Sequence, residues 1–435
     1  MTTKTTLKTL RDFESRNVTF IAQDGSWPIV WRRAKGTFVW DAEGKKYLDL
    51  TAAFGVAAAG HANPNVVKAG QKQMGELLHA MGDVHPHARK AELARELSRI
   101  TFERWTAKAK SSKSIGKTIF CNSGFEAVEA ALKTAILATG KREVVAFAGS
   151  YHGLGYGTLN VTHRNFFRRP FHPQLREFGH FVPFPKSAHD LVAVESHLHR
   201  LLRRKKIGAI LVEPVQARGG INVPPTEFLS LLRKLCDQSG ALLVADEIYT
   251  GFGRTGKWFA CEHSGAVPDL ICLGKALTGG FPLSACVGRA DLMDRAWPAS
   301  EGEAIHTSTF LGHPVGCAMA LAQIKEIRRL NLCKHSRDLG DFLLARLNEI
   351  KNLKFKSSAR GLGLMAGVEL NLPNGKPATA AALKAITKML HRGYILLPEG
   401  EHGNIISFTP PLTISKAQLA NTVKTLHEIL FHEIE

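Results

Sequence analysis

Two residues of opposite charge each follow a short apolar run, at the point where a β-strand would end. Lys275 stands in Leu-Gly-Lys-Ala-Leu-Thr-Gly-Gly, and Asp246 ends the stretch Ala-Leu-Leu-Val-Ala-Asp. A poorly solvated lysine is favoured as the neutral amine, the form that makes a Schiff base with a carbonyl. A carboxylate at the end of a buried strand needs a cationic partner, and a protonated ring nitrogen would supply one. Each pattern alone is also typical of ordinary structure, because lysines after strands usually reach water and aspartates often cap helices or form ion pairs.

A helix start and an aromatic residue are further candidates for ligand contacts. Residues 122–126 read Asn-Ser-Gly-Phe-Glu, which combines a Ser-x-x-Glu capping box with a glycine that leaves backbone amides open to an anion. Tyr151 follows another apolar run, and its ring could lie on a flat ligand. Capping requires no anion, and a tyrosine in such a place is more often ordinary packing.

The middle of the chain alternates short apolar runs with segments of helical period. Strand runs are expected at 117–121, 143–148, 207–212, 241–245 and 269–274, with helices at 126–139 and 226–239. This alternation predicts an α/β fold with a large, mostly parallel sheet covered on both faces. Ligands of such sheets collect at the carboxyl ends of the strands. The residues that directly follow the runs are Ser123, Gly124, Tyr151, His152, Glu213, Asp246 and Lys275.

The chain beyond about Ala318 has a different character, which favours a second, smaller α+β domain. It contains a long helix-like stretch at 319–350, an apolar run at 363–370 and a final helix after Ile414. We expect the residues around 38–50 to complete this domain. The predicted organisation is therefore an N-terminal segment of the small domain (1–60), a large domain (61–317) and a C-terminal small domain (318–435).

The net charge of +19 is the one unusual bulk property of this 435-residue chain. Positive charge attracts phosphates, carboxylates or nucleic acid. The basic clusters are short: Lys108, Lys110, Lys113 and Lys117; Arg164, Arg168 and Arg169; and 203–206. No nucleic-acid-binding pattern accompanies them, so we interpret them as solvated surface and expect no nucleic-acid partner.

Cysteine usage and hydropathy bear on the compartment. The seven cysteines are scattered and never form a Cys-x-x-Cys pair, which indicates neither a disulfide framework nor a metal site. No apolar run reaches the roughly 20 residues needed to cross a bilayer, and residues 1–20 lack the apolar core of a secretory signal. These features favour a cytoplasmic protein without a membrane span.

Taken together, the motifs resemble one family: the class III pyridoxal-phosphate (PLP) aminotransferases, which include the 4-aminobutyrate, ornithine, acetylornithine and ω-amine enzymes. The resemblance runs from about Gly36 to the C-terminus. The matching segments are 41–49, 60–61, 122–127, 151–153, 212–216, 246–247, 250–256, 273–280, 309–314 and 410–414. The resemblance implies PLP fold type I, similar to aspartate aminotransferase, and a homodimer whose active sites lie at the subunit interface.

The resemblance also implies roles for residues that would hold the cofactor ring. Lys275 would carry PLP as a Schiff base and move the proton during the reaction, and Asp246 would keep the pyridine nitrogen protonated. Tyr151 would stack on one ring face and Ile248 would press on the other. Tyr249 replaces a frequent glutamine, and its hydroxyl would reach the 3′ oxygen of the ring.

Further contacts implied by the resemblance involve the phosphate. Gly124 and the backbone amide of Phe125 would bind it at a helix N-terminus, helped by Thr309 of the other subunit. Phe125 stands where Ser, Thr or Ala is usual, so any hydroxyl contact at that position is lost. The remaining expected cofactor contacts are Ser123, His152 and Glu213.

A paired departure concerns the substrate. Many relatives have an arginine in the strand before Pro-Pro-Leu to bind the α-carboxylate of glutamate, but this chain has Ser407 there. The glutamate that pairs with that arginine is replaced here by Arg218. Our hypothesis is that Arg218 binds the substrate carboxylate, with Phe54 as a second substrate contact. The alternative is an outward-facing Arg218 paired with a surface acid.

The predicted function is transfer of an amino group between a small amine or amino acid and a 2-oxo acid, through the pyridoxamine form of the cofactor. An alternative on the same fold is a PLP-dependent isomerase, either an amino-acid racemase or an aminomutase. A third possibility, a basic nucleic-acid-binding or scaffold protein that has lost catalysis, is disfavoured because Lys275 and Asp246 are both present.

Overall fold

The computed structural model describes residues 1–107, 115–350 and 354–434. Its largest sheet has seven strands in the order β4-β10-β9-β8-β7-β5-β6. Only β10 runs antiparallel to its neighbours, β4 and β9. The α/β class with a large, mostly parallel sheet is thereby confirmed. The strands are β4 (Gly116–Cys121), β5 (Glu143–Phe147), β6 (Gly179–Val182), β7 (Ile207–Val212), β8 (Leu242–Asp246), β9 (Leu270–Leu273) and β10 (Ser284–Arg289).

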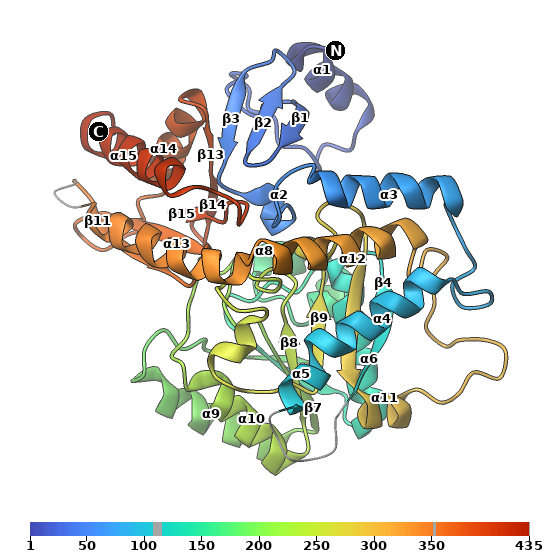
Figure 1. The fold of residues 1–435 in the computed structure, drawn as a ribbon. Helices are drawn as coiled ribbons and strands as arrows, with labels where there is room; N and C mark the ends of the chain where they lie inside the picture. Colours follow the sequence, from blue (N-terminus) through green and yellow to red (C-terminus); the bar gives the residue numbers. More distant parts are fainter. Residues whose placement is uncertain (108–114, 351–353, 435) are drawn as a thin grey trace.

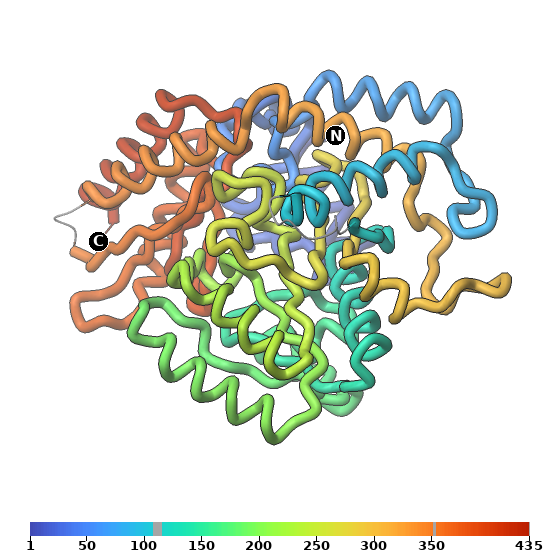
Figure 2. Tube along the Cα trace, turned by 60° about the horizontal axis from the view of Figure 1, so that its bottom comes forward, coloured from blue at the N-terminus to red at the C-terminus, as the bar shows by residue number. Residues whose placement is uncertain are grey.

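Helices cover both faces of this sheet because its central strands are apolar on both sides (Figures 1 and 2). Val144, Leu211 and Val244 pack with the alanine-rich face of α6 (Gly124–Thr139). Their sequence neighbours on the same strands, including Val145 and Leu243, instead pack against α9 (Asp190–Arg204) and α10 (Phe228–Ser239). Successive strand residues point to opposite faces, so a strand buried on both sides reads as a continuous apolar run.

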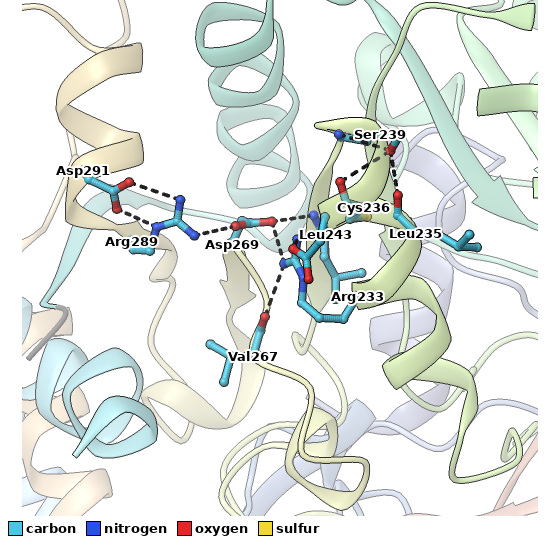
Figure 3. A network of polar contacts seen from close by, with 11 residues as sticks. Arg233, Leu235, Cys236, Ser239, Leu243, Val267, Asp269, Arg289 and Asp291 are labelled. Atoms are coloured by element: carbon cyan, nitrogen blue, oxygen red, sulfur yellow. Dashed lines mark hydrogen bonds and ion pairs between the residues drawn. The ribbon is translucent and has the colours of Figure 1, made fainter. Parts of the chain in front are cut away.

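A buried acid at the start of β9 fixes that strand against its neighbours (Figure 3). Asp269 accepts hydrogen bonds from Arg233 of α10 at 2.7 Å, from Arg289 of β10 at 3.0 Å and from the amide of Leu243 in β8 at 2.9 Å. The contacts join three elements at the amino end of β9, and Lys275 follows at the carboxyl end. This network therefore helps to set the register that delivers the lysine.

The chain also forms two smaller sheets, and one of them combines the two ends of the chain. One has the order β1-β2-β3-β13, in which β3 pairs in parallel with β13; the other has the order β11-β12-β15-β14. Figure 1 shows the N-terminal strands beside the C-terminal segment. The boundaries after residues 60 and 317 stay predictions. The strands are β1 (Trp31–Lys35), β2 (Phe38–Asp41), β3 (Lys46–Asp49), β11 (Lys356–Gly361), β12 (Ala366–Asn371), β13 (Tyr394–Ile395), β14 (Leu397–Glu399) and β15 (Ile405–Phe408).

The expectation of one helix-like stretch over 319–350 is wrong, because two helices occupy it. α12 (Pro314–Arg329) ends before Asn331, and α13 (Leu332–Asn348) follows it. Asn331 has a φ of 49°, a left-handed conformation that asparagine tolerates better than most residues and that stops the helix. α12 packs on α3 (Pro64–Glu76) and α4 (Ala88–Ile100).

The remaining helices are α1 (Thr3–Phe13), α2 (Ala52–Gly55), α5 (Phe102–Thr106), α7 (Tyr156–Leu159), α8 (Asn165–Arg168), α11 (Ala290–Ala296), α14 (Thr379–His391) and α15 (Lys416–His432). Within the described ranges, none of the helices combines the length and the hydropathy that a bilayer crossing requires. Lys108, Lys110 and Lys113 of the first basic cluster lie outside the described residues.

Candidate active site

A cavity of about 360 Å³ opens at the carboxyl ends of the central strands. It gathers residues from loops that are far apart in the sequence, because the parallel strands all end at this edge of the sheet. Ten of the predicted site residues line it: Gly124, Phe125, Tyr151, His152, Glu213, Arg218, Asp246, Ile248, Tyr249 and Lys275.

Lys275 projects its amine into the cavity from the second residue after the end of β9. Its backbone has a φ of 43°, and its Nζ atom lies 3.8 Å from the centre of the Tyr249 ring. Burial lowers the pKa of Lys275 to about 8, although the nearby charge of Asp246 opposes this shift. Lys275 therefore holds a substantial fraction of neutral amine at physiological pH, which a nucleophilic amine needs.

Asp246 and His152 form a buried pair on the wall of the cavity. Asp246 Oδ2 lies 2.7 Å from His152 Nδ1, and Asp246 Oδ1 accepts from the amide of Ile248 at 3.2 Å. His152 Nε2 is buried and has no hydrogen-bond partner in the described chain. The arrangement holds the carboxylate in one orientation, so that it offers its charge to a group in the cavity.

The N-terminus of α6 presents unsatisfied polar groups beside this pair. Glu126 accepts hydrogen bonds from the amides of Asn122 at 2.7 Å and Ser123 at 3.4 Å, which is the glutamate half of the expected capping box. Ser123 Oγ is buried and has no partner within the described chain. A Cβ atom at Gly124 would lie 3.1 Å from the Ile248 side chain, so a larger residue would crowd that side chain. Free amides, a free hydroxyl and the helix dipole suit a phosphate.

Glu213 fixes the loop that carries Tyr151. Its carboxylate accepts from the amide of Tyr151 at 2.9 Å and from the amide of Ala217 at 3.3 Å. Burial raises the pKa of Glu213 to about 7, while the two backbone hydrogen bonds and His152 act in the opposite direction. The acid thus ties the loop after β5 to the loop after β7.

Arg218 lies on the cavity wall and faces a buried acid that sequence reasoning missed. Its Nη1 atom is 3.6 Å from Glu399 Oε2, and Glu399 is only 4% exposed. Burial raises the pKa of Glu399 to about 7, although Arg218 and Arg164 lower it. Arg164 also donates to the carbonyl of Arg218 at 3.2 Å. The alternative of an outward Arg218 paired with a surface acid does not describe this geometry.

Three predicted site residues do not line the cavity. Ser123 stands beside it, at the start of α6, whereas Phe54 is 52% exposed on the 51–55 segment. Thr309 is exposed on the segment between α11 and α12. Sequence reasoning did not find Gly153, Leu154, Ala217, Thr250 and Glu399. The first four lie within two residues of predicted ones, so a window around each strand end would have found them. Glu399 has no such signal, because β14 was not predicted.

The residues present fit PLP. The cavity combines the Lys275 amine with its lowered pKa, the oriented Asp246 carboxylate and an aromatic ring. Beside them lies a helix start whose Ser123 hydroxyl has no hydrogen-bond partner in the described chain. An amine for the aldehyde, an acid for the pyridine nitrogen and open amides for the phosphate are the groups that this cofactor requires. Fold and site together define a PLP-dependent enzyme of the α/β class.

Comparisons with known proteins agree with this definition. The family model described as aminotransferase class-III matches residues 20–430. An acetylornithine aminotransferase of Methanosarcina mazei is 36% identical over 404 residues, which cover 93% of this chain and 92% of the relative. A 5-aminovalerate aminotransferase of Pseudomonas aeruginosa is 37% identical over 413 residues, covering 92% and 93%. The solved structure of a transaminase from the marine bacterium Virgibacillus superimposes with a TM-score of 0.88 at 26% identity and covers 98% of both chains.

The chain therefore belongs to the class-III aminotransferase family. It is a PLP-dependent enzyme that moves an amino group between a small amine or amino acid and a 2-oxo acid. The relatives are named as aminotransferases, which supports transamination and does not support the isomerase alternative.

Proposed function

We propose that the amino donor is an amino acid and that Arg218 binds its carboxylate. The observation that carries this proposal is the placement of the Arg218 guanidinium on the wall of the cavity that also holds Lys275. A guanidinium recognises a carboxylate through two parallel hydrogen bonds. Relatives that act on acetylornithine and 5-aminovalerate, both of which carry a carboxylate, agree with this choice.

Within this proposal the cavity residues have distinct roles. When bound, PLP would supply an electron sink and an aldehyde that reacts with amines, and Lys275 would hold it. Asp246 would bind the ring nitrogen and keep it protonated, with His152 orienting the Asp246 carboxylate at 2.7 Å. The Lys275 amine would accept and return the proton at the reacting carbon of the donor. Its lowered pKa suits both directions of transfer near neutral pH.

The other predicted contacts complete the cofactor pocket in the same proposal. Tyr151 and Ile248 would cover the two ring faces, and Tyr249 would contribute its hydroxyl. Because Glu213 ties down the loop that carries Tyr151, it supports the stacking. Ser123, Gly124 and the amide of Phe125 would bind the phosphate, with Thr309 of the partner subunit. Phe54, which is exposed on the 51–55 segment, would contact the substrate.

A matched donor pair tests the proposed function. 5-Aminovalerate and 1-aminopentane present the same primary amine on the same carbon chain, but only the first has a carboxylate. We expect the loaded enzyme without an acceptor to release one equivalent of carbonyl product from 5-aminovalerate, with a second-order rate constant at least tenfold above that for 1-aminopentane. Equal specificity for the two donors would rule out carboxylate recognition, and release of a rearranged amino acid without carbonyl product would rule out transfer.

We also propose that the enzyme is a homodimer. The segment between α11 and α12 exposes Ile305 and Phe310 beside Thr309, at 68% and 54% exposure for the two apolar residues. Apolar side chains on one exposed segment are typical of a surface that another chain covers. Sedimentation equilibrium should give twice the chain mass, and a monomer at micromolar concentration would contradict this proposal.

A cytoplasmic location is part of the proposal as well. All seven cysteines are free and six are buried, as expected in a reducing compartment. Cell fractionation should recover the protein with the soluble cytoplasmic enzymes; recovery from a secreted or membrane fraction would contradict it.

A further inference from the structure

The segment that follows β3 adopts a conformation that side-chain-bearing residues rarely take. We call residues 51–55, which include the short α2, the 51–55 turn. Its members Ala52, Ala53, Phe54 and Gly55 have φ values of 47°, 49°, 61° and 81°. Left-handed backbone is uncommon for any residue except glycine, and here three consecutive residues with side chains adopt it. Such strain persists only where the surrounding structure holds it in place.

A buried acid holds the turn. Asp49 is fully buried, and its Oδ1 atom accepts from the amide and the hydroxyl of Thr51 at 2.8 and 2.6 Å. Its Oδ2 atom accepts from the amide of Ala53 at 3.2 Å and lies 2.7 Å from His61 Nε2. The backbone of His61 is itself fixed, because it exchanges two hydrogen bonds with Gly36 at 2.9 and 2.7 Å. Asp49 is therefore clamped between a rigid histidine and a strained turn.

The 51–55 turn supports the Tyr249 ring beneath the Lys275 amine. A Cβ atom at Gly55 would lie 3.0 Å from Cε1 of Tyr249, so the backbone of the turn rests directly on that ring. The Lys275 amine lies 3.8 Å from the centre of the same ring. The Tyr249 hydroxyl is 3.2 Å from the Thr409 hydroxyl, which is 3.3 Å from the carbonyl of Thr51. The ring edge and the hydroxyl of Tyr249 are thus both held by contacts that lead to the turn.

We propose that Asp49 and His61 are positioning residues, which hold the 51–55 turn in its left-handed form and thereby place Tyr249 under the Lys275 amine. The inference goes beyond the proposed substrate, and it holds whether or not Arg218 binds a carboxylate. Neither residue contacts the cavity. Their effect reaches the reaction only through the turn and the tyrosine ring.

The first test replaces Asp49 by asparagine, which leaves one acceptor oxygen and loses the other. The turn then relaxes, the ring moves from the amine, and water reaches Lys275. In the cofactor-free protein, Lys275 is labelled with an amine reagent over a range of pH and the labelling is followed by peptide mass spectrometry. We expect the pH midpoint of labelling to rise by about half a unit or more, because burial is what lowers the pKa of Lys275. In the loaded enzyme kcat should fall about tenfold, as a small misplacement of a reacting group implies.

A strain-relieving substitution separates this role from ordinary structural support. Ala53→Gly allows a positive φ without a steric penalty, so the double variant Asp49→Asn/Ala53→Gly should recover most of the labelling midpoint and of kcat. Ala53→Gly alone should resemble the wild type. Ala58→Gly is the matched control, because Ala58 lies just beyond the turn without a positive φ, and it should rescue nothing.

A second pair keeps the proposal testable if Asp49→Asn does not fold. His61→Gln retains a hydrogen-bond donor for Asp49, whereas His61→Ala does not. We expect the alanine variant alone to raise the labelling midpoint and to lower kcat. An unchanged midpoint in Asp49→Asn and in His61→Ala, or a loss that Ala53→Gly does not rescue, would overturn the inference.

Discussion

Replacing Arg218 by alanine should selectively impair donors that carry a carboxylate. Loss of the carboxylate contact as a whole should cost about 1.5 to 3 kcal/mol, which corresponds to a loss of roughly 10- to 150-fold in kcat/KM. Repulsion from Glu399 should add little to this loss. The pKa of Glu399 is about 7 while Arg218 lowers it, so removing the arginine raises that pKa further and the acid becomes neutral near pH 7.

The assay compares kcat/KM for 5-aminovalerate and 1-aminopentane in four proteins: wild type, Arg218→Ala, Glu399→Gln and the double variant. Arg218→Ala should lose activity on 5-aminovalerate and keep it on 1-aminopentane. The double variant should match Arg218→Ala within about twofold, since a neutral Glu399 and a glutamine are similar in charge. Glu399→Gln alone should favour the carboxylate donor, because it frees the guanidinium from its 3.6 Å partner. A parallel loss for both donors in Arg218→Ala would refute the reasoning.

Three further outcomes follow from groups near the site and under the sheet. The pKa of Lys275 in the folded protein is about 8, below its usual 10.5, so the charged amine destabilises the cofactor-free fold. Urea unfolding should therefore show that Lys275→Met is more stable than the wild type by about 3 kcal/mol below pH 8. This difference in stability should vanish as the pH rises through 10.5. Ser123→Ala removes a buried hydroxyl beside the cavity, so PLP affinity should fall about fivefold to tenfold, and an unchanged affinity would exclude the phosphate contact. Asp269→Asn leaves Arg233 and Arg289 without their shared acid and should destabilise the fold by about 3 kcal/mol. The kcat per folded molecule should stay near that of the wild type. A stability loss below about 0.5 kcal/mol would contradict the role of this network.

Local patterns were sufficient to predict the framework of the large sheet. The five expected strand runs became β4, β5, β7, β8 and β9, because strands buried on both faces read as continuous apolar runs. The same patterns placed Asp246 and Lys275 at strand ends, and the structure brings them to one cavity. β10 was not predicted, because its sequence Ser-Ala-Cys-Val-Gly-Arg contains no long continuous apolar run.

Long-range pairing explains what the sequence alone could not show. Glu399 faces Arg218 only because β14 pairs with β15, which brings a residue 181 positions away to the cavity wall. The strain of the 51–55 turn is likewise invisible in its sequence, since Ala-Ala-Phe is a combination that would suit a helix. Its left-handed conformation depends on Asp49 and His61, which are adjacent in space through the Gly36 bridge.

The cavity at the carboxyl ends of the strands has a consequence for how the cell maintains this enzyme. Its walls come from loops as far apart as Gly124 and Lys275, so the unfolded chain has no binding site and only the finished sheet captures the vitamin-derived ligand. A ligand present at 100 times its Kd adds about 2.7 kcal/mol to the native state. Vitamin supply should therefore set the abundance of this protein as well as its turnover, because starved cells would leave more chains open to proteolysis.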